Sequence, residues 1–166
     1  YDFGQASVDE SDPLGRFNWG YDPVNYNAPE GAYSTDPTDP YARINELKQA
    51  VDTVHENGMG VIMDVVYNHV FSVGEHAFDK IVPGYYFRYD ENGNLRNGTG
   101  VGNETASERT MMRKFMVDSL TYWAETYNLD GFRFDLMGIH DTETMQEVYE
   151  ELVKINPNIF ILGEGW

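Results

Sequence analysis

The sequence contains no cysteine, which excludes disulfide bonds and thiolate chemistry and leaves the cellular compartment open. Basic residues are also scarce: 11 Lys and Arg stand against 28 Asp and Glu, giving a formal net charge of −17 over 166 residues. Such a chain offers no basic surface to a phosphate backbone, so we expect no nucleic acid among its partners. No run of about 18 apolar residues occurs, and we therefore expect no membrane-spanning helix.

The N-terminus lacks an initiator methionine, and the residues after Tyr1 lack the basic and apolar stretches of a signal peptide. We therefore expect the chain to be a segment of a longer protein, and no localisation is predicted. Hydrophobic residues make up 41% of the chain and aromatic residues 14%, which is too apolar for a disordered acidic tail. The chain is expected to fold around a core.

Apolar residues at helical spacing alternate with short apolar runs that are typical of strands buried on both faces. This alternation predicts right-handed βαβ units and a parallel sheet, which is an α/β fold. The predicted order is a long loop (1–41), a helix (40–56), a strand (60–66), a long loop (67–107), a helix (105–127), a strand (132–137), a helix (145–155) and a strand (159–164).

Signals at the helix ends support these boundaries. Asp39 and Pro40 predict the start of the first helix, because a capping acid precedes a proline in the first turn. Gly58 predicts its end, since glycine readily takes the left-handed conformation that follows many helices. Thr105-x-x-Glu108 matches a capping box and predicts the start of the second helix.

Each predicted strand carries a carboxylate at or near its carboxyl end: Asp64, Asp135 and Glu164. Parallel α/β folds build their sites at that end of the strands. A structural interpretation exists for each residue, because Arg133 and Asp135 could form an ion pair within the sheet and Glu164 could cap a following helix. Three carboxylates on consecutive strands favour a functional site, since burying a carboxylate without a partner is costly.

Two close carboxylates beside an arginine suit retaining glycoside hydrolysis, in which one attacks the anomeric carbon and the other protonates the leaving oxygen. Arg133 stands two residues from Asp135 on the same strand face and favours its ionised form, as a nucleophile requires. Glu164 has no cation nearby in the sequence and lies between two glycines. We expect an apolar setting that raises the pKa of Glu164 and suits a general acid.

Three segments resemble conserved regions of the α-amylase superfamily: Asp64–His69 (DVVYNH), Gly131–Asp135 (GFRFD) and Gly163–Trp166 (GEGW). A fourth segment, Phe17–Pro23 (FNWGYDP), closely resembles the YNWGYDP signature of type I pullulanases and departs from it only at Phe17. The segment Asp135–Asp141 (DLMGIHD) is also similar to pullulanases. The resemblance extends over essentially the whole chain.

The resemblance implies a role for each matching residue. Asp135 resembles the nucleophile and Glu164 the general acid/base, while Arg133 resembles the arginine that orients the nucleophile. The remaining residues would contact substrate: Asp64 and His69 line the subsite of the attacked glucose, Tyr21 stacks on that sugar, and Trp166 lies in the third matching region.

Several of these residues also have structural interpretations. Tyr21 could be a packing aromatic of the loop, and His69 could be a structural histidine. His140 is a weaker candidate for substrate contact. Asn68 matches a position that coordinates calcium in many α-amylases, so calcium is possible although no cofactor is required.

The resemblance implies that residues 1–166 are a fragment of a catalytic (β/α)8 TIM barrel, covering about strands 3 to 5. The fragment would include the loop after strand 2 and an extended loop after strand 3 (67–107). It is shorter than the roughly 250 residues of a closed barrel. The superfamily also needs a third carboxylate on a later strand, and Asp141 lies in the wrong place for it. We therefore expect the isolated chain to be poorly folded and inactive.

The implied activity of the parent enzyme is cleavage of α-1,6-glucosidic bonds in pullulan, amylopectin and limit dextrins through a covalent glucosyl–Asp intermediate. The alternatives are another α-glucan enzyme, such as an isoamylase or a branching enzyme, and an inactive sugar-binding fragment that lacks the third carboxylate.

Overall fold

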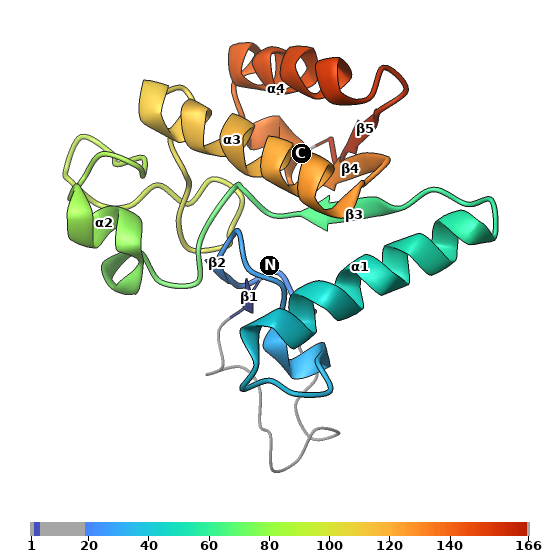
Figure 1. Cartoon of the computed structure of the whole chain (residues 1–166). Helices are drawn as coiled ribbons and strands as arrows, with labels where there is room; N and C mark the ends of the chain where they lie inside the picture. The colour runs from blue at the N-terminus through green and yellow to red at the C-terminus, as the bar shows by residue number, and fades with distance from the viewer. Residues whose placement is uncertain (1, 4–18, 166) are drawn as a thin grey trace.

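The computed structural model describes residues 2–3 and 19–165. Its centre is a parallel three-stranded sheet in the order β3–β4–β5 (Figure 1). Helices alternate with these strands along the chain, so the predicted α/β class and parallel sheet are confirmed. The elements around the sheet are α1 (Pro40–Glu56), β3 (Ile62–Val65), α3 (Thr110–Tyr127), β4 (Gly131–Phe134), α4 (Thr142–Ile155) and β5 (Phe160–Gly163).

Local signals fix the ends of α1 and α3. The Asp39 carboxylate accepts a hydrogen bond from the N–H of Tyr41, and Pro40 occupies the first position of α1. Gly58 follows α1 with φ +73°, as predicted. Asn128 ends α3 in the left-handed conformation at φ 54°.

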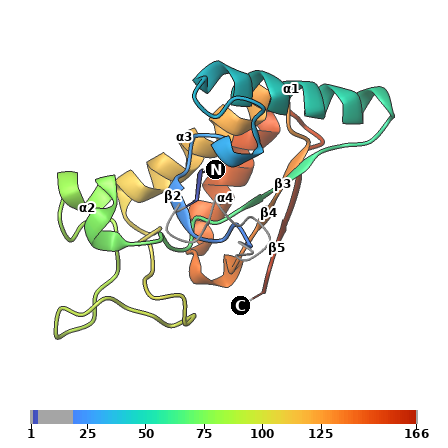
Figure 2. The ribbon, with the colours of Figure 1, turned by 90° about the horizontal axis from the view of Figure 1, so that it is seen from below.

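The two faces of the sheet differ because side chains alternate along each strand. The helices α3 and α4 lie along one face of the sheet (Figure 2). Val65, Phe132 and Phe134 are buried in the hydrophobic core on that face. On the opposite face, the side chains of Ile62 and Phe160 remain 46% and 53% exposed. Helices therefore cover one face of the sheet, and the other face carries exposed apolar residues.

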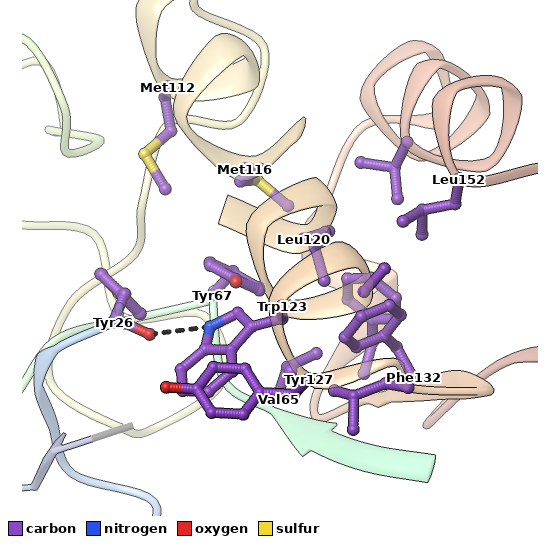
Figure 3. Packing of buried hydrophobic residues seen from close by; sticks show 14 of the residues in the cluster. Tyr26, Val65, Tyr67, Met112, Met116, Leu120, Trp123, Tyr127, Phe132 and Leu152 are labelled. Atoms are coloured by element: carbon purple, nitrogen blue, oxygen red, sulfur yellow. Dashed lines mark hydrogen bonds between the residues drawn. The ribbon is translucent and has the colours of Figure 1, made fainter. Parts of the chain in front are cut away.

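The core lies between the sheet and the two helices that cover it. Trp123 of α3 is 1% exposed, and its Nε1 donates to the Tyr26 carbonyl at 3.1 Å, which ties the N-terminal segment to this helix (Figure 3). Leu120 of α3 and Leu152 of α4 are equally buried. Among the described residues, no helix combines the length and apolarity that crossing a bilayer would need.

Both predicted long loops contain short elements that their glycine and proline content concealed. A pair of antiparallel strands and a 3-10 helix interrupt the first loop, and a 3-10 helix and a short α-helix interrupt the second. These elements are β1 (Asp2–Phe3), β2 (Pro23–Asn25), η2 (Gly31–Tyr33), η3 (Val73–Glu75) and α2 (Ala77–Ile81).

The predicted capping box at the start of the second long helix is wrong. The helix α3 begins at Thr110, and its N-terminus has no side-chain cap. The hydroxyl of Thr105 instead donates to the carbonyl of Tyr67, and the Glu108 carboxylate accepts from Arg88. Tertiary partners thus engage both side chains that the sequence pattern assigns to the cap.

Candidate active site

One guanidinium joins the carboxylates at the ends of all three strands. Register places Asp64 of β3 directly beside Arg133 of β4, and Arg133 Nη1 lies 2.9 Å from Asp64 Oδ1. The same nitrogen lies 3.3 Å from Asp135 Oδ1, and Nη2 lies 3.4 Å from Glu164 Oε2. Because three carboxylates share one cation, their mutual repulsion is offset within the site. The hydrogen bond that Arg133 donates to Asp64 is the main reason that the pKa of Arg133 is raised above its usual value.

Asp135 is held through its backbone as well as its side chain. Its N–H donates to the Val65 carbonyl at 3.0 Å, which extends the pairing of β3 and β4 by one residue. Asn68 Nδ2 donates to the Asp135 carbonyl at 2.8 Å and to Asp135 Oδ2 at 2.9 Å. The side chain of Asp135 is only 14% exposed. The nucleophile candidate therefore has a fixed orientation.

The calcium role that the resemblance suggests for Asn68 stays a prediction. The Nδ2 of Asn68 donates a hydrogen bond to the Asp135 carboxylate, and its Oδ1 contacts His69 Nδ1. Across residues 2–3 and 19–165, no cluster of three acidic or histidine side chains could hold a metal ion. Calcium usually takes six to eight oxygen ligands, so such a site would need donors besides Asn68.

The surroundings of Glu164 differ from the apolar setting expected for it. Its side chain is 32% exposed and lies near the Arg133 guanidinium. Its N–H donates to the Phe134 carbonyl at 2.9 Å, and its Oε2 accepts from the N–H of Leu136 at 3.2 Å. The expectation failed because a residue on the neighbouring strand supplies the cation, and separation along the chain hides that proximity.

Tyr21 reaches the same site from the N-terminal segment. Its hydroxyl donates to Asp64 Oδ2 at 2.7 Å, and this hydrogen bond raises the pKa of Tyr21 to about 12. The phenol therefore remains a protonated donor at neutral pH. Its hydrogen bond fixes one edge of a ring that could stack on a sugar.

His69 lies just beyond β3, next to the residue that holds the nucleophile candidate. It is 4% exposed, and burial lowers its pKa although the carboxylates of Asp135 and Asp22 act in the opposite direction. The imidazole is therefore neutral at pH 7. A neutral imidazole has one donor and one acceptor nitrogen, which suits a sugar hydroxyl.

The structure gathers most of the predicted site residues at the carboxyl ends of the three strands. Trp166 lies outside the described residues. His140 is buried at 8% exposure and packs against Phe134, with ring centroids 6.5 Å apart, rather than lying open to a substrate. The predicted residues that come together are Tyr21, Asp64, His69, Arg133, Asp135 and Glu164.

Two contacts of the site escape prediction from sequence. Asn68, which the resemblance links to calcium, positions the nucleophile candidate through two hydrogen bonds. Leu136 adopts a left-handed conformation, with φ 44° and ψ 47°, and directs its N–H at Glu164. Leucine gives no sequence signal for that conformation, which glycine and asparagine usually occupy.

The chain is homologous to starch-debranching glycoside hydrolases along nearly its whole length. These relatives are pullulanases. The pullulanase of Bacillus subtilis strain 168 is 53% identical over 161 residues, which is 97% of this chain and 22% of that protein. No family model matches the chain.

Solved structures agree with this sequence similarity. The crystal structure of the Paenibacillus barengoltzii pullulanase complexed with maltohexaose and α-cyclodextrin has a TM-score of 0.95 and 54% identity, over 100% of this chain and 26% of that one. The Anoxybacillus sp. LM18-11 pullulanase complexed with maltotriose has a TM-score of 0.94 and 57% identity, over 99% of this chain and 23% of that one. The predicted resemblance to type I pullulanases is thus confirmed. The chain spans 22% to 26% of the lengths of these relatives.

Proposed function

We propose that this chain is a segment of the catalytic domain of a pullulanase-type enzyme, which cleaves α-1,6-glucosidic bonds in pullulan, amylopectin and limit dextrins. The observation that carries the proposal is the contact of Arg133 with Asp64, Asp135 and Glu164. It brings a nucleophile and an acid from neighbouring strands to one cation. The maltohexaose and maltotriose complexes of related pullulanases support an α-glucan as the substrate.

Asp135 is the nucleophile of the proposed mechanism. Its carboxylate attacks the anomeric carbon and forms a covalent glucosyl ester while the bond to the leaving glucan oxygen breaks. Glu164 donates its proton to that oxygen. In the second step Glu164 accepts a proton from water, whose oxygen attacks the anomeric carbon and releases Asp135.

Other residues of the site bind and orient the attacked glucose. Tyr21 presents its ring to the apolar face of the sugar, while Asp64 and the neutral His69 offer hydrogen bonds to its hydroxyl groups. Arg133 holds the Asp135 carboxylate in place through its Nη1, which lies 3.3 Å from Asp135 Oδ1. Trp166 joins this set by its family resemblance alone. No step requires a cofactor.

The proposed parent fold is a (β/α)8 barrel in which β3, β4 and β5 are strands 3, 4 and 5, with residues 1–166 all in that domain. The exposed side chains of Ile62, Phe160 and Leu162 support this placement, because a closed barrel buries its inner face among side chains of the other strands. Segment 67–107 is then the extended loop after strand 3. The third carboxylate would come from a later strand.

A chimeric enzyme tests the proposed activity. The matched 161 residues of the B. subtilis pullulanase would be replaced by the corresponding part of this chain. We expect the chimera to release maltotriose from pullulan, which a branching enzyme would not do. A folded chimera without debranching activity would contradict the proposal.

Two substitutions in the chimera test the assigned roles. We expect Asp135→Asn and Glu164→Gln each to lower kcat on pullulan by at least about 100-fold, the lower range for loss of an acid, base or nucleophile. Asp118→Asn is the matched control, because this exposed carboxylate on α3 pairs only with Lys114 among the contacts described. Near-normal turnover of either site variant would refute its role.

A further inference from the structure

The chain makes a closed turn directly after Asp135, and this turn holds Glu164. Leu136 is left-handed, and the 3-10 helix η4 (Met137–Ile139) follows it. The N–H of Ile139 donates to the Leu136 carbonyl at 3.1 Å, so the turn is closed on itself. At its start, the N–H of Leu136 donates to Glu164 Oε2 at 3.2 Å. A shift of the turn would therefore move the Leu136 N–H that donates to Glu164, the proposed acid.

Asp135 does not depend on this turn to the same degree. The carbonyl of Val65 fixes its N–H, and Asn68 fixes both its carbonyl and its carboxylate. Arg133 contacts the other carboxylate oxygen. All these partners come from β3, its following residues, or β4. Movement of the turn would thus affect Glu164 more than Asp135.

Arg88 holds the far end of the turn from the segment between α2 and α3. Its Nη1 donates to the Ile139 carbonyl at 2.9 Å, across 51 residues of sequence. Nη2 and Nε donate to Glu108 Oε2 at 2.7 and 3.1 Å, and Nη1 lies 3.5 Å from the buried Glu104 carboxylate. The Arg88 side chain is 15% exposed, so this planar fork is held in one orientation.

We infer that Arg88 is a positioning residue that fixes Glu164 through the turn from Leu136 to Ile139. This inference rests on the proposed function, because it concerns the acid step of that reaction. It extends the site by a chain of two contacts: Arg88 to the Ile139 carbonyl, and the Leu136 N–H to Glu164. The long segment after β3 therefore acts on the chemistry without touching the substrate.

Two substrates with different leaving groups separate this role from a general structural one. Pullulan loses a glucan oxygen, which needs the proton of Glu164, whereas α-maltosyl fluoride loses fluoride with its electron pair and needs little protonation. Both reactions form the same bond from Asp135 to the anomeric carbon. The quantity to compare is kcat/KM, because it reports formation of the covalent intermediate and excludes its later hydrolysis.

We expect Arg88→Met in the chimera to lower kcat/KM about 10- to 100-fold on pullulan, the range for a misplacement near 1 Å. On α-maltosyl fluoride the loss should stay under about threefold. Arg109→Met is the matched control, because Arg109 donates to a loop carbonyl, that of Gly84 at 3.1 Å, and does not hold the turn. It should leave both rates within about twofold.

Arg88→Lys tests the same idea with the charge retained. A single ammonium remains near Glu104 and Glu108. It cannot make all the hydrogen bonds of the planar guanidinium, which also donates to the Ile139 carbonyl. We expect a loss on pullulan that is smaller than for Arg88→Met and again selective. If Arg88→Met does not fold, this variant decides the test.

Equal losses on both substrates, or no loss on either, would overturn the role of Arg88. If the unmodified chimera cleaves pullulan while the Arg88 variants show no selectivity, only this inference fails. If the unmodified chimera is folded and inactive on both substrates, the proposed function fails and this inference falls with it.

Discussion

Protonation of His140 should destabilise the segments around it as the pH falls from 6.5 to 4. The side chain is 8% exposed, and within the described part of the chain neither ring nitrogen has a hydrogen-bond partner. Burial, and secondarily the positive charge of Arg88, lower the pKa of His140 to about 4, although Asp141 opposes this. Because the folded state resists the proton that an open state accepts, acid favours opening.

The size of the effect follows from the two pKa values. Above pH 6.5 the imidazole of His140 is neutral in both the folded and the open state, so its contribution to the opening free energy is constant. Below pH 6.5, each pH unit lowers the opening free energy by about 1.4 kcal/mol. The gap between the two pKa values, 6.5 and about 4, amounts to about 3 kcal/mol. The loss ends near pH 4, where the folded state also binds the proton.

Hydrogen exchange read by mass spectrometry measures this effect locally, in peptides that cover residues 104–108 and 137–141 of the chimera. After correction for intrinsic exchange rates, the opening free energy should fall between pH 6.5 and 4 in the unmodified protein. In His140→Gln the part of this fall that comes from His140 should vanish. Subtracting the pH profile of the variant from that of the unmodified protein removes the titration of other groups. Parallel profiles for the two proteins would refute the reasoning.

Three further substitutions test the site and the core. Asn68→Ala removes one hydrogen bond to the Asp135 carbonyl and one to its carboxylate. It should lower kcat on pullulan about 10- to 100-fold, because a hydrogen bond to a charged group contributes roughly 1.5–3 kcal/mol. An unchanged kcat would show that Asp135 is held without Asn68. Tyr21→Phe removes one 2.7 Å hydrogen bond to the carboxylate on β3 and should cost roughly tenfold in kcat/KM; a loss under twofold would contradict that. Leu120→Ala removes a fully buried side chain on α3 and should lower the free energy of unfolding of the chimera in urea by about 2–5 kcal/mol. Met111→Ala is the control at an exposed position and should cost under about 0.5 kcal/mol. Equal losses would place Leu120 outside the core.

The strands and their carboxylates could be predicted because both follow from short-range patterns. Side chains alternate along a strand, so Arg133 and Asp135 had to share a face. Parallel strands align their carboxyl ends, so Asp64 and Glu164 had to lie near them. These patterns survive in the structure because the opposite face is buried by α3 and α4.

The parts that escaped prediction depend on contacts between distant segments. Arg133 reaches Glu164 across 31 residues, which removed the apolar setting expected for that carboxylate. The Thr105 side chain bonds to the chain after β3 instead of capping α3. The left-handed Leu136 has no residue-type signal, and it stands at the start of the turn that leads into η4. Such features arise from register and packing, which no local window contains.

The most direct test of the central claim is identification of the residue that carries the covalent sugar. The chimera would be incubated with a fluorinated maltosyl donor whose intermediate hydrolyses slowly, then digested and sequenced by mass spectrometry. The account predicts one added glycosyl mass on Asp135, and none in Asp135→Asn. A label on another carboxylate, or none while the enzyme still turns over pullulan, would contradict it.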